Sequence, residues 1–294
     1  ASLLHTHLRQ GASVALCNTF TYPETALEML AQRQCTGIAG VPSSYQLLLK
    51  ASTFADTAYP TLRQIQQAGG KLADDLIDRV RAAQPQAEVF VMYGQTEATS
   101  RLSYLPPELL DQRRGSIGKG IPGVTLRLCN DDGTDVPPGQ TGEIRAAGAN
   151  ITKGYWQDPD ATAEKFVAGE LRTGDLARQD DSGYFYIVGR KADFIKSWGY
   201  RIAPAEVEEC LKEHDDVHDV AVVGTPDLEA GEAVVAFVSL EPGVTGDPES
   251  LLNICRAALP KHMVPHSIRF LDDLPLNASG KVDKPLLRAM AEQD

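Results

Sequence analysis

Apolar residues recur at helical spacing in some stretches of the first third of the chain and in short continuous runs in others. The pattern predicts helices in alternation with strands: helices over 23–34, 43–50 and 72–84, and strands over 36–40, 62–68 and 88–93. Such alternation is typical of a mainly parallel sheet with helices on its faces. A further strand is expected over 13–16, directly after a short initial helix. Residues 1–113 are therefore expected to form an α/β subdomain.

The rest of the chain changes pattern twice. Over 114–189 the strands are short and turn signals such as DDG, PPG and DSG are frequent, which is typical of an antiparallel barrel or sandwich. From about residue 194 the order is helix, two long apolar strands, helix, strand and helix, which predicts a compact α+β domain. We therefore expect a large domain over 1–189 and a small one over 194–294, as the chain length of 294 residues also favours.

The joint between these two domains is cationic in an otherwise acidic chain. The stretch GRKADFIKSWGYRI, residues 189–202, carries Arg190, Lys191, Lys196 and Arg201, and a helix start follows at once. Its two glycines allow the backbone to turn or to approach another group closely. These features are what we expect of a domain joint that holds an anion.

Composition narrows the classes of function. The chain has 28 basic and 40 acidic residues and a formal net charge of −12, which argues against non-specific binding of nucleic acid. No apolar run is long enough to span a membrane, and the first residues do not form a signal peptide. The five cysteines are scattered without a CxxC pair, as expected for reduced thiols of a cytoplasmic protein. Two histidine pairs, His5/His7 and His214/His218, lack an obvious third ligand, so no metal site is predicted there.

The sequence YGQTEAT, residues 93–99, follows a buried strand. Loops at the carboxyl ends of parallel strands are where open α/β sheets bind ligands. Thr96 offers a hydroxyl and Glu97 a carboxylate, a pair suited to a phosphate group and Mg²⁺. The alternative is a strand followed by an ordinary helix that Thr96 caps.

Three other short segments carry weaker signals, and for each alone the purely structural interpretation is the more common one. Gly69-Gly70 lets a ring or a phosphate approach the backbone, or is an ordinary turn between a strand and a helix. Asp175, in TGD, can accept hydrogen bonds from both hydroxyls of a ribose, or is a turn residue. Lys281, in PLNASGKVDK, is a mobile point charge at the tip of a tight loop, or a solvated surface lysine.

Taken in order, five segments resemble the motifs of the adenylate-forming superfamily, which includes acyl-CoA synthetases and other AMP-dependent synthetases and ligases. The segments extend over nearly the whole chain and are YGQTEAT, GEIRAAGANITKGYW, TGD, GRKADFIKSWGYRIAPAEVEE and PLNASGKVDK. The resemblance implies a large domain with an α/β part and a β-barrel part, followed by a small mobile α+β domain. It also implies a reaction in which a carboxylic acid attacks the α-phosphate of Mg·ATP, giving acyl-AMP and pyrophosphate, before a thiol displaces AMP.

The same resemblance implies roles for individual residues. The nucleotide-binding positions would be Gly69, Gly70, Lys71, Tyr93, Gly94, Gln95, Thr96, Asp175 and Arg190. The catalytic positions would be Lys281, Thr96, Glu97 and Arg201. Thr96 would contact the α-phosphate, Glu97 would bind Mg²⁺, and Asp175 would hold the ribose hydroxyls. Arg201 would face phosphate, and Lys281 would bridge the attacking carboxylate and the α-phosphate. A cation placed where charge develops on phosphoryl oxygens lowers the barrier.

In this family the small domain rotates between the two half-reactions. The hinge would lie at 190–193, at Ala192 and Asp193, and the family usually has Asp or Lys in the place of Ala192. Alanine tolerates a change of backbone angles but has no side-chain hydrogen bond to hold either orientation, a role that Asp193 is expected to take. One orientation would present the catalytic lysine, and the other the thiol-path loop at Trp198-Gly199.

A further departure from the family concerns its Ser/Thr/Gly-rich phosphate loop, which contains a lysine. Nothing in the chain matches that loop, and the first sheet begins without a preceding strand. We therefore expect the chain to start within the second N-terminal subdomain and to need a missing N-terminal segment of the same enzyme, or a separate chain. By itself the chain is expected to be catalytically incomplete.

The stretch GYRIAPAEVEE, residues 199–209, is more similar to acyl-CoA synthetases than to the adenylation domains of peptide synthetases. A fatty or aromatic acid is therefore expected as substrate, with ATP and CoA as cosubstrates, and a homodimer is compatible with the sequence. Other interpretations stay open: a ligase that loads a carrier-protein thiol, a non-catalytic truncated relative that binds a nucleotide or a protein partner, and, more distantly, an oxidative activity like that of beetle luciferases.

Overall fold

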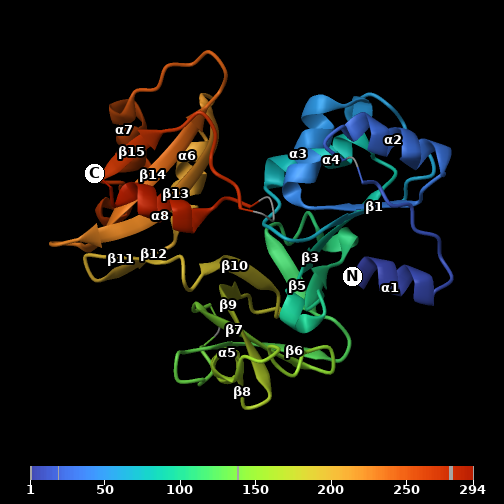
Figure 1. Cartoon of the computed structure of the whole chain (residues 1–294), viewed down its shortest axis with the longest axis horizontal. Helices are drawn as coiled ribbons and strands as arrows, with labels where there is room; N and C mark the ends of the chain where they lie inside the picture. The colour runs from blue at the N-terminus through green and yellow to red at the C-terminus, as the bar shows by residue number, and fades with distance from the viewer. Residues whose placement is uncertain (1, 19, 138, 278–280, 294) are drawn as a thin grey trace. The chain divides into compact units, whose positions relative to one another are not determined.

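The computed structural model describes residues 2–18, 20–137, 139–277 and 281–293, and the chain divides into two compact units, Ala1–Ile187 and Val188–Asp294. In Figure 1 the N-terminal unit runs from blue to yellow and the C-terminal unit from yellow to red. Among the described residues, no helix combines the length and the apolar character that crossing a membrane requires. A rotation of the second unit about residues 190–193 stays a prediction.

The first part of the N-terminal unit alternates helices and strands, as the apolar pattern predicts. The helices are α1 (Ser2–Arg9), α2 (Pro23–Gln32), α3 (Pro42–Ala51) and α4 (Asp74–Ala83), and the strands are β1 (Gly37–Gly40), β2 (Gln64–Gln67) and β3 (Glu88–Tyr93). The three strands are parallel neighbours. Leu27, Leu48 and Ile77, from α2, α3 and α4, are at most 1% exposed and share one core cluster with Ile65 of β2. These helices therefore cover one face of the parallel strands (Figure 1).

The strand expected over 13–16 is wrong. These residues have no regular secondary structure, and Val14 and Leu16 are 37% and 68% exposed. A short apolar run becomes a strand only where a sheet edge pairs with its backbone. In the described part of the chain, none of the sheets includes this segment.

The second part of the N-terminal unit consists mainly of antiparallel strands. They are β4 (Ser103–Leu105), β5 (Ser116–Gly120), β6 (Val124–Cys129), β7 (Gly142–Gly148), β8 (Phe166–Val167), β9 (Glu170–Gln179) and β10 (Phe185–Arg190), with the helix α5 (Pro159–Lys165) between β7 and β8. Single 3₁₀ turns are η1 (Thr53–Ala55), η2 (Thr96–Ala98) and η3 (Pro107–Leu109).

All these strands join one mixed sheet of order β1-β2-β3-β4-β5-β10-β9-β7-β6, in which β8 pairs with β9. The combination of α/β and β-rich parts is confirmed, but the path is open, and the closed barrel expected over 114–189 is not formed by the described residues. To close a barrel, β6 at the end of this path would have to pair with the free edge of β5, but β4 pairs with that edge instead. It thereby joins the antiparallel strands to the parallel ones.

The C-terminal unit is an α+β domain in which helices cover both faces of one sheet. Its elements are β11 (Ile195–Ser197), β12 (Tyr200–Ile202), α6 (Pro204–Lys212), β13 (Val217–Asp227), β14 (Gly231–Leu240), α7 (Pro248–Ala258), η4 (Lys261–Met263), β15 (Ser267–Phe270) and α8 (Lys284–Ala291). The sheet order is β12-β11-β14-β13, and β15 runs parallel to β14. The small hairpin of β11 and β12 is an element that the apolar pattern does not predict.

The two long strands of this sheet are buried on both sides. Val222 and Ala236 share a cluster with residues of α6 and α7, whereas their sequence neighbours Val223 and Phe237 share another with α8. Successive residues of a strand point to opposite faces, so a strand covered on both faces needs apolar residues throughout. This explains the continuous apolar sequences of β13 and β14.

Candidate functional site

The loops after β2 and β3 lie at one edge of the sheet. The two strands are parallel and in register, with Gln67 of β2 opposite Val91 of β3, so their carboxyl ends are neighbours. The structure therefore brings together two groups of predicted residues: Gly69, Gly70 and Lys71 after β2, and Tyr93, Gly94, Gln95, Thr96 and Glu97 at the end of β3 and in the following loop.

Packing accounts for the two glycines after β2. Gly69 has a φ of 91°, and a Cβ atom there would lie 3.1 Å from Val41 Cγ1. A Cβ atom on Gly70 would lie 3.3 Å from Cγ of Pro42, the first residue of α3. The close approach of the chain to the start of α3 is therefore sufficient to explain both glycines. This agrees with the alternative that Gly69-Gly70 is an ordinary turn between a strand and a helix. Their position at the sheet edge still leaves room for a nucleotide role.

The loop after β3 folds back on itself. A Cβ atom on Gly94 would lie only 2.0 Å from the carbonyl oxygen of Ser100, so no larger residue fits there. Thr99 has a φ of 51°, in the left-handed region, which reverses the chain direction. The N-cap of η2 is Gln95, without a side-chain capping hydrogen bond, and Thr96 lies inside η2 with an exposed side chain. The interpretation of Thr96 as a helix cap is therefore wrong.

The segment GANITKGY, residues 148–155 at the end of β7 and after it, holds this loop through hydrogen bonds. Asn150 Nδ2 donates to the carbonyl oxygens of Ala98 and Arg101 at 3.0 and 2.8 Å. The hydroxyl of Tyr155 donates to Glu97 Oε1 at 2.6 Å. Burial of the phenol and its hydrogen bond to Glu97 raise the pKa of Tyr155 to about 12. Asn150 and Tyr155 carry no individual signal in the sequence, although both lie in the motif GEIRAAGANITKGYW.

Asp175 and Tyr93 meet across the sheet. They are 82 residues apart in sequence, and the hydroxyl of Tyr93, in β3, donates to Asp175 Oδ2, in β9, at 2.6 Å. Asp175 is only 5% exposed. The interpretation of Asp175 as a simple turn residue is therefore wrong, because the residue lies within a strand. The contact joins two motifs that the sequence analysis assigned to the same nucleotide.

A bulge in β9 directs Asp175. On one side of it Glu143 of β7 pairs with Leu176, and on the other side Arg145 pairs with Arg172. Three residues of β9, Thr173, Gly174 and Asp175, therefore face the single residue Ile144 of β7. Gly174 has a φ of 77°, a conformation that glycine adopts without steric cost. A bulge re-aims a side chain, and here it turns the TGD motif out of the regular ladder.

Glu97 is the carboxylate of YGQTEAT that could bind a metal ion at this edge. Among the described residues, no group of three or more His, Cys, Asp or Glu side chains could hold a metal. Glu97 is half-buried and lies one residue after the exposed hydroxyl of Thr96. Mg²⁺ commonly binds through one or two carboxylates, several waters and phosphate oxygens of a substrate, so this donor set fits Mg²⁺ brought in with a nucleotide.

The remaining predicted residues belong to the linker and the C-terminal unit. Lys281 is exposed, and its backbone N–H donates to Asn277 Oδ1 at 3.1 Å. Residues 278–280 of the same loop lie outside the described residues. Arg201 is exposed on β12, and Arg190 is exposed at the end of β10.

The predicted hinge residues contact the last helix within the C-terminal unit. Arg288 of α8 donates to the carbonyl oxygen of Ala192 at 3.2 Å. The same guanidinium lies 3.6 Å from Asp193 Oδ1. Asp193 therefore provides a side-chain interaction beside Ala192, which itself offers only its backbone. Whether the hinge moves is not tested by this contact, and that part stays a prediction.

The thiol-path residues form the tip of a hairpin beside a cavity. Ser197 pairs with Tyr200, so Trp198 and Gly199 make a two-residue loop, with φ of 52° and 78°. Positive φ at both positions is what a type I′ turn requires, and it is unusual for a residue as bulky as tryptophan. The cavity beside this hairpin measures about 820 Å³. This volume lies within the range of roughly 300–1,000 Å³ that is common for ligand pockets.

The lining of this cavity combines aromatic, apolar and basic side chains. The residues are Trp198, Tyr200, Arg256, Leu259, Lys261, His262, Val264, Pro265 and His266. The rings of Tyr200 and His262 are stacked with centroids 3.9 Å apart. The sequence analysis predicted Trp198 but missed the others, because they come from three separate segments.

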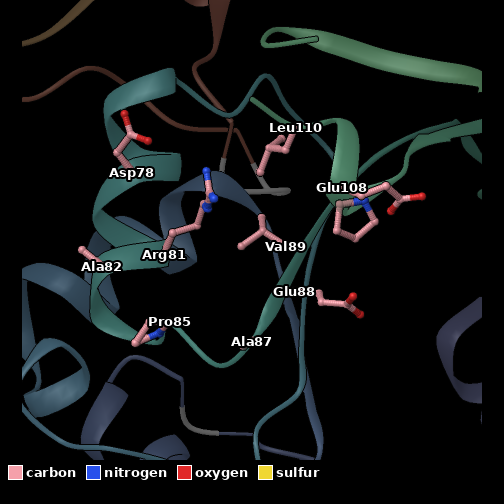
Figure 2. Close-up of a pocket in the computed structure, with 10 residues that line it drawn as sticks. Asp78, Arg81, Ala82, Pro85, Ala87, Glu88, Val89, Glu108 and Leu110 are labelled. Carbon is pink, nitrogen blue, oxygen red and sulfur yellow. The ribbon is translucent and has the colours of Figure 1, made fainter. Parts of the chain in front are cut away.

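A second cavity, of about 440 Å³, lies in the N-terminal unit between α4 and the start of β3 (Figure 2). Arg81 and Asp78 line it from α4, Glu88 from β3 and Glu108 from η3. It adjoins the amino end of β3, whereas YGQTEAT follows the carboxyl end. None of the residues that the sequence analysis selected lines this cavity, so it is separate from the predicted site.

Two family models match the chain. The model of the AMP-binding enzyme family matches residues 2–156, and the model of the AMP-binding enzyme C-terminal domain matches residues 206–281. The chain is 35% identical over 284 residues to an indoleacetate–CoA ligase of Aromatoleum aromaticum, which covers 96% of this chain and 55% of that protein. It is also 35% identical over 279 residues to a long-chain-fatty-acid–CoA ligase of Escherichia coli O6:H1, which covers 95% of this chain and 49% of that protein. The chain thus spans about half the length of these relatives.

Solved structures give the same picture. An o-succinylbenzoate CoA synthetase from Bacillus subtilis, in complex with its acyl-adenylate intermediate, matches with a TM-score of 0.86 and 31% identity over 98% of this chain and 57% of that one. A structure of an enzyme with the same name and source, with ATP and a magnesium ion, matches with a TM-score of 0.86 and 30% identity over 97% of this chain and 58% of that one.

Proposed function

Since the chain belongs to the AMP-binding enzyme family, we propose that it is part of an AMP-forming ligase that activates a fatty or aromatic carboxylic acid and transfers the acyl group to CoA. In the first step a carboxylate oxygen bonds to the α-phosphorus of ATP and pyrophosphate leaves. In the second step the thiol sulfur bonds to the acyl carbon, AMP leaves, and the thiol proton passes to solvent. The activity is proposed for the whole protein that contains this chain, because the relatives are about twice as long.

The observation that carries the proposal is the hydrogen bond between Tyr93 and Asp175. It unites the YGQTEAT and TGD motifs at the edge where parallel strands end, which is where open α/β sheets bind nucleotides. A carboxylate accepts hydrogen bonds from two neighbouring hydroxyls, as a ribose offers them. We assign Asp175 to the ribose and the Tyr93 ring to the adenine side of the same nucleotide.

The loop after β3 is proposed to hold the phosphate end of the nucleotide. The exposed hydroxyl of Thr96 would donate to an α-phosphate oxygen, and Glu97, oriented by Tyr155, would bind Mg²⁺. When bound, Mg²⁺ neutralises charge on the phosphate oxygens. Lys281 would place a cation between the attacking carboxylate and the α-phosphate, and Arg201 would add a second cation. Such charges lower the barrier to phosphoryl transfer when they are positioned before the reaction.

The cavity at the Trp198-Gly199 hairpin favours CoA as the acceptor. Stacked rings and the side chains of Arg256 and Lys261 suit a ligand with a base and phosphate groups, which CoA has. A carrier-protein thiol would need no such cavity. The names of the relatives, which include ligases of indoleacetate and long-chain fatty acids, support an acid of the fatty or aromatic class.

The proposal is tested with the full-length protein that contains this chain. Acid-dependent ATP–pyrophosphate exchange and thioester formation are measured with indoleacetate, o-succinylbenzoate, a long-chain fatty acid and a series of amino acids. We expect exchange with at least one of the non-amino acids and its CoA thioester as product. Exchange without a CoA thioester, but with loading of a carrier protein, supports the carrier-loading ligase. Nucleotide binding without exchange for any acid supports the non-catalytic relative and overturns the proposal.

A further inference from the structure

The bulge that directs Asp175 depends on a buried carboxylate of the neighbouring strand. Because three residues of β9 face one residue of β7, the ladder cannot pair every backbone group of the bulge. The N–H of Gly174, the central residue, donates to Glu143 Oε1 at 3.2 Å. Glu143 therefore supplies the acceptor that the β7 backbone cannot provide at this position.

The same carboxylate binds the residue before the bulge. Glu143 Oε2 accepts a hydrogen bond from Arg172 Nη2 at 3.2 Å. The side chain of Glu143 is 3% exposed, which is rare for glutamate unless a cation compensates the buried charge. One carboxylate thus connects to positions 172 and 174, on both sides of Thr173.

Thr173 completes the support from inside the bulge. Its hydroxyl donates to the carbonyl oxygen of Ile144 at 2.7 Å and accepts from the N–H of Asp175 at 3.1 Å. Thr173 is 1% exposed. Two buried side chains, the carboxylate of Glu143 and the hydroxyl of Thr173, therefore hold the backbone N–H groups of Gly174 and Asp175. A carboxylate held in this way keeps one direction, and in this structure it faces the Tyr93 hydroxyl.

We propose that Glu143 is a positioning residue for nucleotide recognition: through the Gly174 N–H it holds the bulge in which Asp175 presents its carboxylate to the ribose hydroxyls. The inference rests on the ribose role of Asp175 in the proposed function. Glu143 itself does not touch the nucleotide, because it lies below the bulge and is buried. A carboxylate receives two neighbouring hydroxyls only in a narrow range of orientations, so loss of this support costs ribose recognition before it costs folding.

The test measures the preference of the chain for ribose over 2′-deoxyribose. Dissociation constants for AMP and 2′-deoxy-AMP are determined by calorimetry for the unchanged chain and for Glu143→Ala. We expect the unchanged chain to bind AMP about tenfold more tightly, the effect of one hydrogen bond to a charged group. In Glu143→Ala we expect this ratio to fall below about threefold, with the affinity for 2′-deoxy-AMP changed by less than about threefold. A purely structural role would weaken both ligands in parallel and leave the ratio unchanged.

Two further variants keep the test decisive. Glu170→Ala removes a carboxylate of β9 that is paired with Arg127 at 2.6 Å and lies outside the bulge, and it should leave the ratio unchanged. Glu143→Met keeps the length of the side chain but offers Gly174 only a weak sulfur acceptor, so the ratio should fall as in Glu143→Ala. If Glu143→Ala fails to fold, an unchanged ratio in Glu143→Met overturns the inference.

The failure of the inference is distinct from the failure of the proposed function. If the unchanged chain prefers AMP and Glu143→Ala keeps the full preference, the positioning role is wrong and the ribose role of Asp175 stands. If the unchanged chain does not bind AMP, the same constants are measured with the full-length protein that contains it. If AMP then binds without preference, or does not bind, the ribose role of Asp175 is wrong and the inference falls with it.

Discussion

Asp175 in the N-terminal unit and the Trp198 and Lys281 segments of the C-terminal unit hold their side chains in opposite ways. In the N-terminal unit, Asp175 is 5% exposed, lies in a strand and accepts a hydrogen bond from Tyr93. In the C-terminal unit, Trp198 is 53% exposed at a hairpin tip, and Lys281 is exposed in a loop. If Asp175 binds the ribose as proposed, ribose recognition depends on a preformed geometry, whereas Lys281 and the Trp198 hairpin, proposed for the two chemical steps, lie at positions with fewer constraints.

Each arrangement has a physical reason. A buried, hydrogen-bonded carboxylate loses little freedom when a ligand binds, so more of the interaction energy appears as affinity. Groups that act in only one of two successive steps must be able to leave the site, and hairpin tips and loops allow this. The contrast therefore makes separate predictions for binding and for each half-reaction, from the largest effect to the smallest.

Substitution of Lys281 should give the largest effect and should act on one half-reaction alone. In the full-length protein, Lys281→Ala is expected to slow acyl-AMP formation by about a hundredfold or more, since a positioned cation stabilises the charge of the transition state. Thioester formation from supplied acyl-AMP should stay within about threefold of the unchanged enzyme. Rapid-quench measurement of each half-reaction checks both expectations.

Lys284, three residues later, provides the control. Its Nζ lies 2.9 Å from Glu208 Oε1, and both side chains are 21% exposed, so it is part of the structure of the C-terminal unit. Lys284→Ala should lower thermal stability and leave the ratio of the two half-reaction rates unchanged. If Lys281→Ala slows both half-reactions equally, Lys281 does not act in one step alone, and the proposed difference between the exposed loop and the buried Asp175 is wrong.

Substitution at the hairpin tip should act on the other half-reaction. Gly199 has a φ of 78° and open space around a Cβ position, so Gly199→Ala introduces backbone strain of about 1–2 kcal/mol without a steric clash. The strain would move the turn that carries Trp198. We expect thioester formation to slow by about tenfold, with acyl-AMP formation unchanged.

Gly243 offers a matched control for this variant. It has a φ of 88° and equally open surroundings, and it lies in the loop between β14 and α7. Gly243→Ala should therefore cost similar stability in a urea titration and leave thioester formation intact. If both variants slow thioester formation to the same extent, the hairpin has no special role and strain anywhere in the unit is sufficient.

The same contrast shows what the sequence could predict. The alternation of helices and strands in the first part follows from apolar spacing, and the two long strands β13 and β14 follow from their continuous apolar runs. The motifs assigned Tyr93 and Asp175 to one nucleotide, which stays a prediction, and the structure brings the two side chains into contact. Their hydrogen bond could not be predicted, because Asp175 lies in a bulge that forms between two strands and that Glu143 and Thr173 contact through hydrogen bonds.

Other features needed long-range pairing that a single sequence does not reveal. Closure of the β-rich part into a barrel fails because β4 takes the edge of β5. The cavity at the Trp198 hairpin is formed by residues of the β11–β12 hairpin, α7 and the segment 259–266, and only the hairpin lies in one of the sequence motifs. The strand expected over 13–16 is wrong for the same reason, since no neighbouring strand in the described chain pairs with it.

The smallest predicted effect is the pH dependence of stability that a buried thiol in the interior of the C-terminal unit causes. Burial, together with the Cys210 thiol beside it, raises the pKa of Cys255 to about 12. A group whose pKa is raised by folding stabilises the folded state below its unfolded pKa and loses this contribution as pH rises through the folded value. The free energy of unfolding should therefore fall more steeply between about pH 9 and 12 in the unchanged chain than in Cys255→Ala.

Urea titrations at several pH values measure both slopes. The half-buried Cys17, replaced by Ala, is the control and should leave the slope unchanged. If the free energy of unfolding falls with pH equally in the unchanged chain and in Cys255→Ala, the Cys255 thiol is as accessible to solvent as groups in the loops. The interior of the C-terminal unit would then not differ from its loops in this respect.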